Sequence, residues 1–134
     1  MNGDDRKHDV DPDAFWDLID LASEDRGAFV AALHSLDRKG LIRFAWTYEE
    51  RASRLMQTRY QRHMAPGLSE DAQDDVARWV VEQGRDRYER VLTYPAEMPS
   101  ERESGTPSPR VYYDADNVFE ERFGEGLPPY GYDD

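Results

Sequence analysis

Hydrophobic residues recur at intervals of three and four positions along residues 12–94, the spacing that places side chains on one face of an α-helix. The pattern is interrupted at residues that start or stop helices, and it predicts helical segments at about 12–22, 23–36, 38–64 and 69–94. Because the third run is the longest, we expect one long central helix of roughly 40 Å. Gly84 is expected to end or bend the fourth segment.

Four polar residues stand where side chains commonly cap the first turn of a helix. The side-chain oxygen at such a position accepts a backbone N–H that has no partner inside the helix. The four predicted caps are Asp11, Ser23, Asp37 and Ser69. Pro12 follows the first of them at a position where the missing N–H of proline costs little.

The remaining chain is less regular. Four prolines with Glu, Ser, Gly and Thr between them make residues 95–109 a loop. Residues 110–113 are expected to form a short extended piece, and Asp114 is expected to cap a last helix that Gly124 ends. The tail, 127–134, holds two prolines and two tyrosines and is a possible docking segment.

These elements predict an all-α fold: a compact array of about five helices with one long central helix, plus an irregular Pro-rich C-terminal segment ending in a short helix. We expect a flexible N-terminus at residues 1–10 and a helical domain at 11–94. Residues 95–134 then form a Pro-rich loop, short helix and tail packed on, or extending from, the same domain. A chain of 134 residues is long enough to bury a core without metals or disulfides.

The composition excludes several kinds of chemistry. The chain has no cysteine, so disulfides, thiolate metal sites and cysteine nucleophiles are excluded. No phosphate-binding glycine loop, nucleophile elbow or His-Glu-x-x-His motif occurs, and we assign no catalytic residue. Neither a leader nor a membrane-spanning stretch is found. We therefore expect a cytoplasmic protein with no membrane contact and no cofactor.

The net charge of −12 is unevenly distributed, because acidic residues dominate both ends of the chain and basic residues dominate 38–64. An acidic chain repels nucleic acid at long range, so we do not expect nucleic acid as a partner. The alternative is that Arg51, Arg54 and Arg59 form one exposed row and contact phosphates. Pairing of these arginines with acids of the same chain is the simpler interpretation.

The sharpest local feature is a group of residues suited to an interface. Arginine binds carboxylates or phosphates through two parallel hydrogen bonds, and tryptophan often anchors protein contacts. The candidate binding residues are Arg78, Trp79, Gln83 and Arg85, with His63 as a possible base or ligand. The same residues suit a structural role, in which the tryptophan is core and the arginines pair with acids of the chain.

A run of acids could place several oxygens on one side of a helix, as Mg²⁺ and Ca²⁺ require. The candidates are Glu70, Asp71, Asp74 and Asp75. Acids in the first turn also complement the helix dipole without any metal, and we favour that interpretation and assign no metal site.

Three stretches together resemble a bacterial family named domain of unknown function 4240. They are 15–20, 68–71 with 78–85, and Tyr88-Glu89 ahead of Pro95. The Trp-aliphatic-aliphatic-x-Gln-Gly-Arg run at 79–85 is the most specific part. The resemblance covers about 13–95, and 112–129 is similar to the family's less regular C-terminal region, whereas 66–67 and 73–76 depart from the family pattern. It implies a small, mostly helical domain and no established activity.

These observations favour a protein-binding module, namely a regulator, adaptor or immunity-type inhibitor. It would cover a basic surface of a protein partner by charge complementarity and would use aromatic anchors. The alternative is an enzyme or small-ligand-binding protein with a polar pocket between the helices at 38–64 and 69–84. The oligomeric state is left open.

Overall fold

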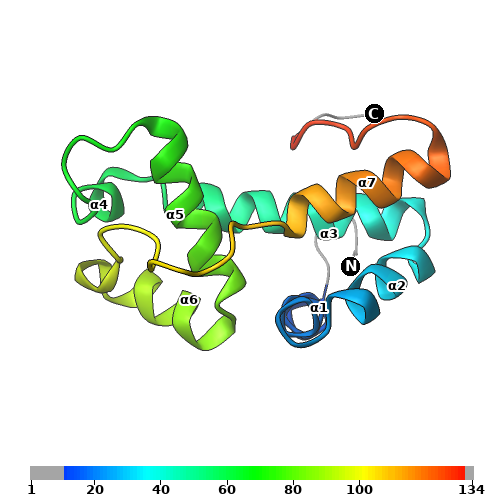
Figure 1. Cartoon of the computed structure of the whole chain (residues 1–134), viewed down its shortest axis with the longest axis horizontal. Coiled ribbons are helices and arrows are strands. Elements are labelled where there is room, and N and C mark those ends of the chain that lie inside the picture. The colour runs from blue at the N-terminus through cyan, green and yellow to red at the C-terminus, as the bar shows by residue number, and fades with distance from the viewer. Residues whose placement is uncertain (1–10, 132–134) are drawn as a thin grey trace, which may run out of the picture. The chain divides into compact units, whose positions relative to one another are not determined.

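The computed structural model describes residues 11–131, which form seven α-helices, one 3₁₀ turn and no strand (Figure 1). The predicted all-α fold class is therefore confirmed for this part of the chain. Contacts divide the chain into two compact units, residues 1–50 with 110–134 and residues 51–109. The predictions for residues 1–10 and for the last residues of the tail, 132–134, lie outside the described residues.

The first unit is built on α-helices that share an aromatic core. It comprises α1 (Pro12–Glu24), α2 (Arg26–Ser35), most of α3 (Arg38–Arg54) and α7 (Val111–Phe123). Helix α2 contacts both α1 and α7. The ring of Phe44 lies 5.4 Å from that of Phe15 and 6.0 Å from that of Phe29, and all three side chains are fully buried. Burial of such large rings is the main force that holds this unit together.

Of the helix caps predicted in this unit, Asp37 is confirmed and Ser23 is not. Asp37 caps α3 as predicted, since its carboxylate accepts the backbone N–H of Gly40 at 2.7 Å. The prediction for Ser23 is wrong, because α1 continues through this residue to Glu24. Asp25 is the first residue with extended backbone, and its carboxylate accepts the backbone N–H of Ala28 at 3.0 Å. Asp25 therefore both ends α1 and caps α2.

The last helix begins one turn earlier than predicted. Residues 111–113 are helical and not extended, and Asp114 lies inside α7 instead of capping it. The reason lies in the buried positions Val111, Ala115, Val118 and Phe119, whose spacing of four, three and one forms one helical face. Starting the helix at Val111 adds that residue to the core. Gly124 ends the helix with a left-handed backbone, as predicted.

The described part of the tail packs against its own unit. The backbone N–H of Leu127 donates to the Asp116 carboxylate at 2.8 Å, and the indole N–H of Trp46 donates to the Pro128 carbonyl at 3.0 Å. Tyr130 meets the edge of the Trp46 ring with 6.2 Å between centroids. These contacts fix the tail to α3 and α7 within the first unit.

The second unit is also helical and includes the end of α3. It comprises α4 (Thr58–Gln61), α5 (Glu70–Glu82), α6 (Arg85–Thr93), the 3₁₀ turn η2 (Pro95–Glu97) and the loop up to residue 109. Ser69 caps α5 as predicted, through the backbone N–H of Ala72 at 3.1 Å. Gly84 ends α5 and has a φ of 106°, a backbone region that favours glycine and allows α6 to begin at once.

The predicted single helix over 38–64 is wrong in its second half. Helix α3 ends at Arg54, a turn follows, and the short α4 spans Thr58–Gln61. A helix that continued from the buried Leu55 would place Arg59 on the buried face four residues later. The turn shifts the register so that Tyr60 is only 1% exposed while Arg59 is exposed. Burying the tyrosine instead of the arginine explains the break.

Candidate functional site

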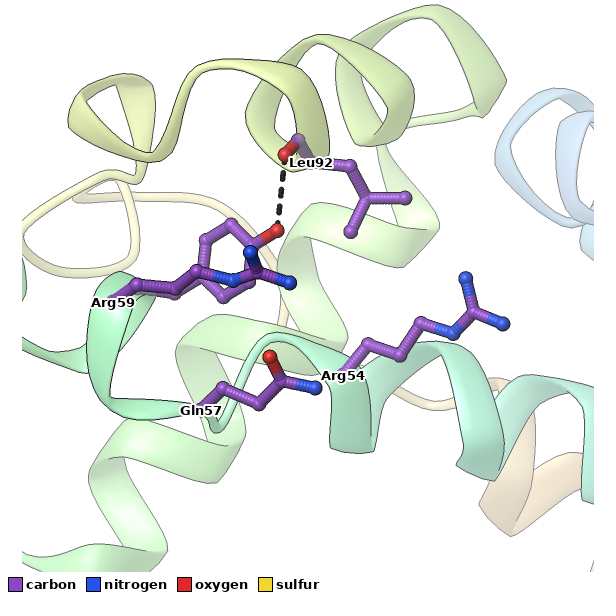
Figure 2. A pocket seen from close by; sticks show the side chains of 5 residues that line it. Arg54, Gln57, Arg59 and Leu92 are labelled. Atoms are coloured by element: carbon purple, nitrogen blue, oxygen red, sulfur yellow. Dashed lines mark hydrogen bonds between the residues drawn. The ribbon is translucent and has the colours of Figure 1, made fainter.

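A small open pocket forms where α3 gives way to α4. It has a volume of about 310 Å³ and is lined by Arg54, Gln57, Arg59, Tyr60 and Leu92, all from the second unit. In Figure 2 the side chains of Arg54, Gln57 and Arg59 rise from one stretch of chain, and Leu92 lies across from them on α6. The pocket therefore lies at the break in the predicted long helix, because its three polar lining residues come from the segment around that break.

A hydrogen bond between two helices holds the base of the pocket. The hydroxyl of the buried Tyr60 donates to the backbone carbonyl of Leu92 at 2.9 Å, which ties α4 to α6 (Figure 2). The Arg59 guanidinium lies over the Tyr60 ring, 5.2 Å from its centroid. Stacking of this kind restricts the arginine and leaves its N–H groups available at the ring edge. The site thus offers a fixed aromatic surface and a positioned cation.

The cations of the pocket lie in a basic part of the chain. Residues 51–69 contain four arginines and neither Asp nor Glu. Two acids of α6 and η2 are paired with other arginines: Glu89 binds Arg85 at 3.0 Å, and Glu97 binds Arg90 at 2.6 Å. The contact with Glu97 raises the pKa of Arg90 above its ordinary value, since the carboxylate stabilises the charged guanidinium by hydrogen bond and charge.

The predicted binding residues lie elsewhere, around the junction of α5 and α6. Arg78 binds Asp74 one helical turn away at 2.7 Å, and Arg85 binds Glu89 one turn away. Trp79 is only 6% exposed, and the Arg87 guanidinium lies 5.6 Å from the centre of its ring. Gln83 is exposed at the end of α5, and half-buried His63 follows α4. None of these side chains lines the pocket at Arg59.

The acids at the start of α5 are not gathered into a metal site. Asp74 pairs with Arg78, and Asp75 pairs with Arg102 of the loop at 2.9 Å. Glu70 and Asp71 lie exposed in the first turn of α5. Within residues 11–131, no three His, Asp or Glu side chains lie close enough to hold a metal ion. The acids instead position an arginine of α5 and fasten the loop.

A second feature lies on α1 in the first unit. The acidic row, by which we mean Asp13, Asp17, Asp20 and Glu24, follows a spacing of four, three and four residues and is exposed throughout. Such spacing places the four carboxylates along one face. Within the described part of the chain, no cation lies at ion-pair distance from Asp17, Asp20 or Glu24. Among the described residues, Asp17, Asp20 and Glu24 therefore present negative charge that no ion pair compensates.

The sequence held signals for both features. The absence of acids from residues 51–69 marks the basic region. A continuous helix was predicted there, so the turn after Arg54, which leaves Arg59 exposed, was not predicted. The excess of acids in the N-terminal part is visible in the composition, and the helical spacing of Asp13, Asp17, Asp20 and Glu24 is the signal for the acidic row. Gln57, Tyr60 and Leu92 carried no signal as pocket residues, because only the turn after α3 brings them together.

A protein-family model covers most of the chain. The family model described as "Protein of unknown function (DUF4240)" matches residues 10–121. The chain belongs to the DUF4240 family. The match contains the acidic row and every residue that lines the pocket, so both features lie within the DUF4240 region of the chain. No curated protein and no solved structure matches the chain.

No helix of this DUF4240 protein within residues 11–131 has both the length and the hydrophobicity needed to cross a membrane.

Proposed function

We propose that this chain is a small acidic protein-binding module of the cytoplasm, a regulator, adaptor or immunity-type inhibitor that covers a basic surface of a protein partner. The acidic row on α1 carries the proposal. Residues 1–50 and 110–134 hold 19 acidic and 8 basic residues, whereas residues 51–109 hold 10 and 9. The negative charge is therefore concentrated in the unit that contains α1, and a partner with clustered Lys and Arg complements it.

The acidic row has a cost in stability that the fold does not require. Like charges one helical turn apart destabilise a helix, by about 1 kcal/mol in total for three such neighbours. Glu24 also lies in the last turn of α1, where a negative charge opposes the helix dipole and no basic residue offsets it. Retaining acids at such positions supports a role in binding.

Exposed tyrosines of the same unit supply candidate anchors. Within the described residues of the first unit, Tyr113 is 58% exposed and Tyr130 is 49% exposed. The Arg110 guanidinium lies 5.5 Å from the centre of the Tyr113 ring and supports that ring from one side. Tyrosine has a large apolar face and few rotatable bonds, so it binds proteins at a low entropic cost.

The experiment is a pull-down from host lysate at low salt with three forms of the protein: the native sequence, Asp17→Asn/Asp20→Asn, and Glu101→Gln/Glu103→Gln. Both variants remove two exposed negative charges, but only the first changes α1. We expect one stoichiometric partner that the first variant loses and the second retains. The purified pair should then associate about tenfold more slowly when the salt rises from low to physiological concentration.

Three results would count against the proposal. They are the absence of any stoichiometric partner, equal losses in both variants, and an association rate that does not change with salt. Equal losses would mean that net charge alone attracts the partner and that α1 forms no specific contact.

A further inference from the structure

The pocket at Arg59 has the chemistry of an anion site and lies outside the unit that carries the acidic row. Its residues therefore supply an inference that does not rest on the proposed protein-binding function. The lining combines two guanidinium groups and one side-chain amide with the ring of Tyr60 and the aliphatic side chain of Leu92. The charged groups of this lining are the guanidinium groups of Arg54 and Arg59, and both are positive.

Arg59 is the principal cation of the site. Within residues 11–131 no carboxylate lies within ion-pair distance of it, and its described interaction is the stacking on Tyr60. Two acids of the facing elements, Glu89 on α6 and Glu97 in η2, are held by other arginines. These two carboxylates therefore do not compete with a ligand for Arg59.

We propose that this pocket binds the phosphomonoester group of a small molecule. The Arg59 guanidinium and the Gln57 amide together present more N–H donors than a carboxylate can accept, whereas a phosphate dianion has three terminal oxygens and a charge near −2. The volume, about 310 Å³, is at the lower end of the range for small-molecule sites. Tyr60 and Leu92 suit an aromatic or aliphatic group next to the phosphate.

The test is a titration of the full-length protein with phenyl phosphate, followed by ¹H–¹⁵N NMR. We expect saturable binding with a dissociation constant on the order of 1 mM, given the few atoms in the probe. The side-chain amide signals of Gln57 and the backbone signals near Arg59 should shift. Benzoate, a carboxylate of similar shape, should bind at least about threefold more weakly.

Matched variants locate the interaction. Arg59→Gln should weaken phenyl phosphate binding about tenfold, and Arg59→Lys, which keeps the charge but loses the planar fork, should fall between it and the native protein. Arg62→Gln removes an equal charge from the same basic segment, outside the pocket lining, and should change the affinity less than about twofold. Circular dichroism and melting curves confirm that each variant is folded.

The pH provides an independent readout. The second pKa of a phosphomonoester is about 6, so the dianion prevails at neutral pH and the monoanion prevails near pH 5. Affinity should therefore fall as the pH is lowered from about 7.5 to about 5, although the arginines stay charged. Benzoate remains a monoanion over this range and serves as the control.

Several results would overturn the proposal. No saturable binding of phenyl phosphate up to about 20 mM would do so, because that concentration is about twenty times the expected dissociation constant. Equal losses in Arg59→Gln and Arg62→Gln would show a diffuse charge effect. Benzoate binding as tightly as phenyl phosphate would assign the pocket to carboxylates, and displacement of phenyl phosphate by single-stranded oligonucleotide at lower concentration would assign it to nucleic acid.

Discussion

Asp114 lies on α7 with only 4% of its surface exposed, and its carboxylate accepts hydrogen bonds from the Arg26 guanidinium, one of them 2.8 Å long. The side chain of Arg26 is about half exposed. The pair links α2 to α7 inside the first unit. Water reaches one partner and not the other, so the two residues are not equivalent in their effect on stability.

This asymmetry gives a prediction for two single substitutions. Arg26→Ala leaves a buried carboxylate without its partner, and we expect the free energy of unfolding to fall by about 3 kcal/mol. Asp114→Ala leaves a guanidinium that water can solvate, and the loss should be about 1–2 kcal/mol. Urea unfolding followed by tryptophan fluorescence measures both. An equal or larger loss for Asp114→Ala would contradict the assignment of Asp114 as the buried partner.

At the scale of the helices, the pattern of hydrophobic residues predicted most of the elements. It did not predict the end of α3 at Arg54, where the pocket lies. The starts of α3 and α5 were predicted because Asp37 and Ser69 act through local hydrogen bonds. The break after Arg54 was missed, because it follows from the tertiary bond between Tyr60 and Leu92, which lies 32 residues further along the chain. Local periodicity holds no information about such a contact.

The candidate sites show the same division. The acidic and basic regions were visible in the composition, because charge is read residue by residue. The fold, however, decides which charged side chains form ion pairs and which do not. Arg78 and Arg85, predicted to bind, are each paired one helical turn away, whereas Arg59 became a candidate only through the turn that exposes it. Pairing along a helix was foreseeable from the spacing; the pocket was not.

The cost attributed to the acidic row is testable on α1 itself. Glu24→Lys places a cation in the last turn and creates an attractive pair with Asp20 at a spacing of four. It should raise the free energy of unfolding by about 0.5–1 kcal/mol, and it should weaken binding to the partner. Asp13→Lys is the control, because the same charge change in the first turn opposes the dipole and should be destabilising. Thermal unfolding of both variants decides the point, and a loss of stability in Glu24→Lys would contradict it.

At the scale of the whole molecule, charge distinguishes the two units. The unit formed by residues 1–50 and 110–134 carries a large excess of acids, and residues 51–109 are close to neutral. Self-repulsion destabilises a compact unit of one sign, and salt screens it. In the nearly neutral unit the same screening weakens the attractive pairs Arg78–Asp74, Arg85–Glu89 and Arg102–Asp75. Added salt should therefore stabilise the first unit, and it should leave the stability of the second unit unchanged or slightly lower.

The three tryptophans allow each unit to be observed separately. Trp16 and Trp46 belong to the first unit and Trp79 to the second, so Trp79→Phe reports on the first unit and Trp16→Phe/Trp46→Phe reports on the second. When sodium chloride rises from about 0.05 M to about 0.5 M, the melting temperature of the first unit should rise by about 4–8 °C, for a gain near 1 kcal/mol. That of the second should stay constant or fall slightly. A single melting temperature with the same salt response in both proteins would show instead that the units unfold together and that the charge excess is shared through the whole chain.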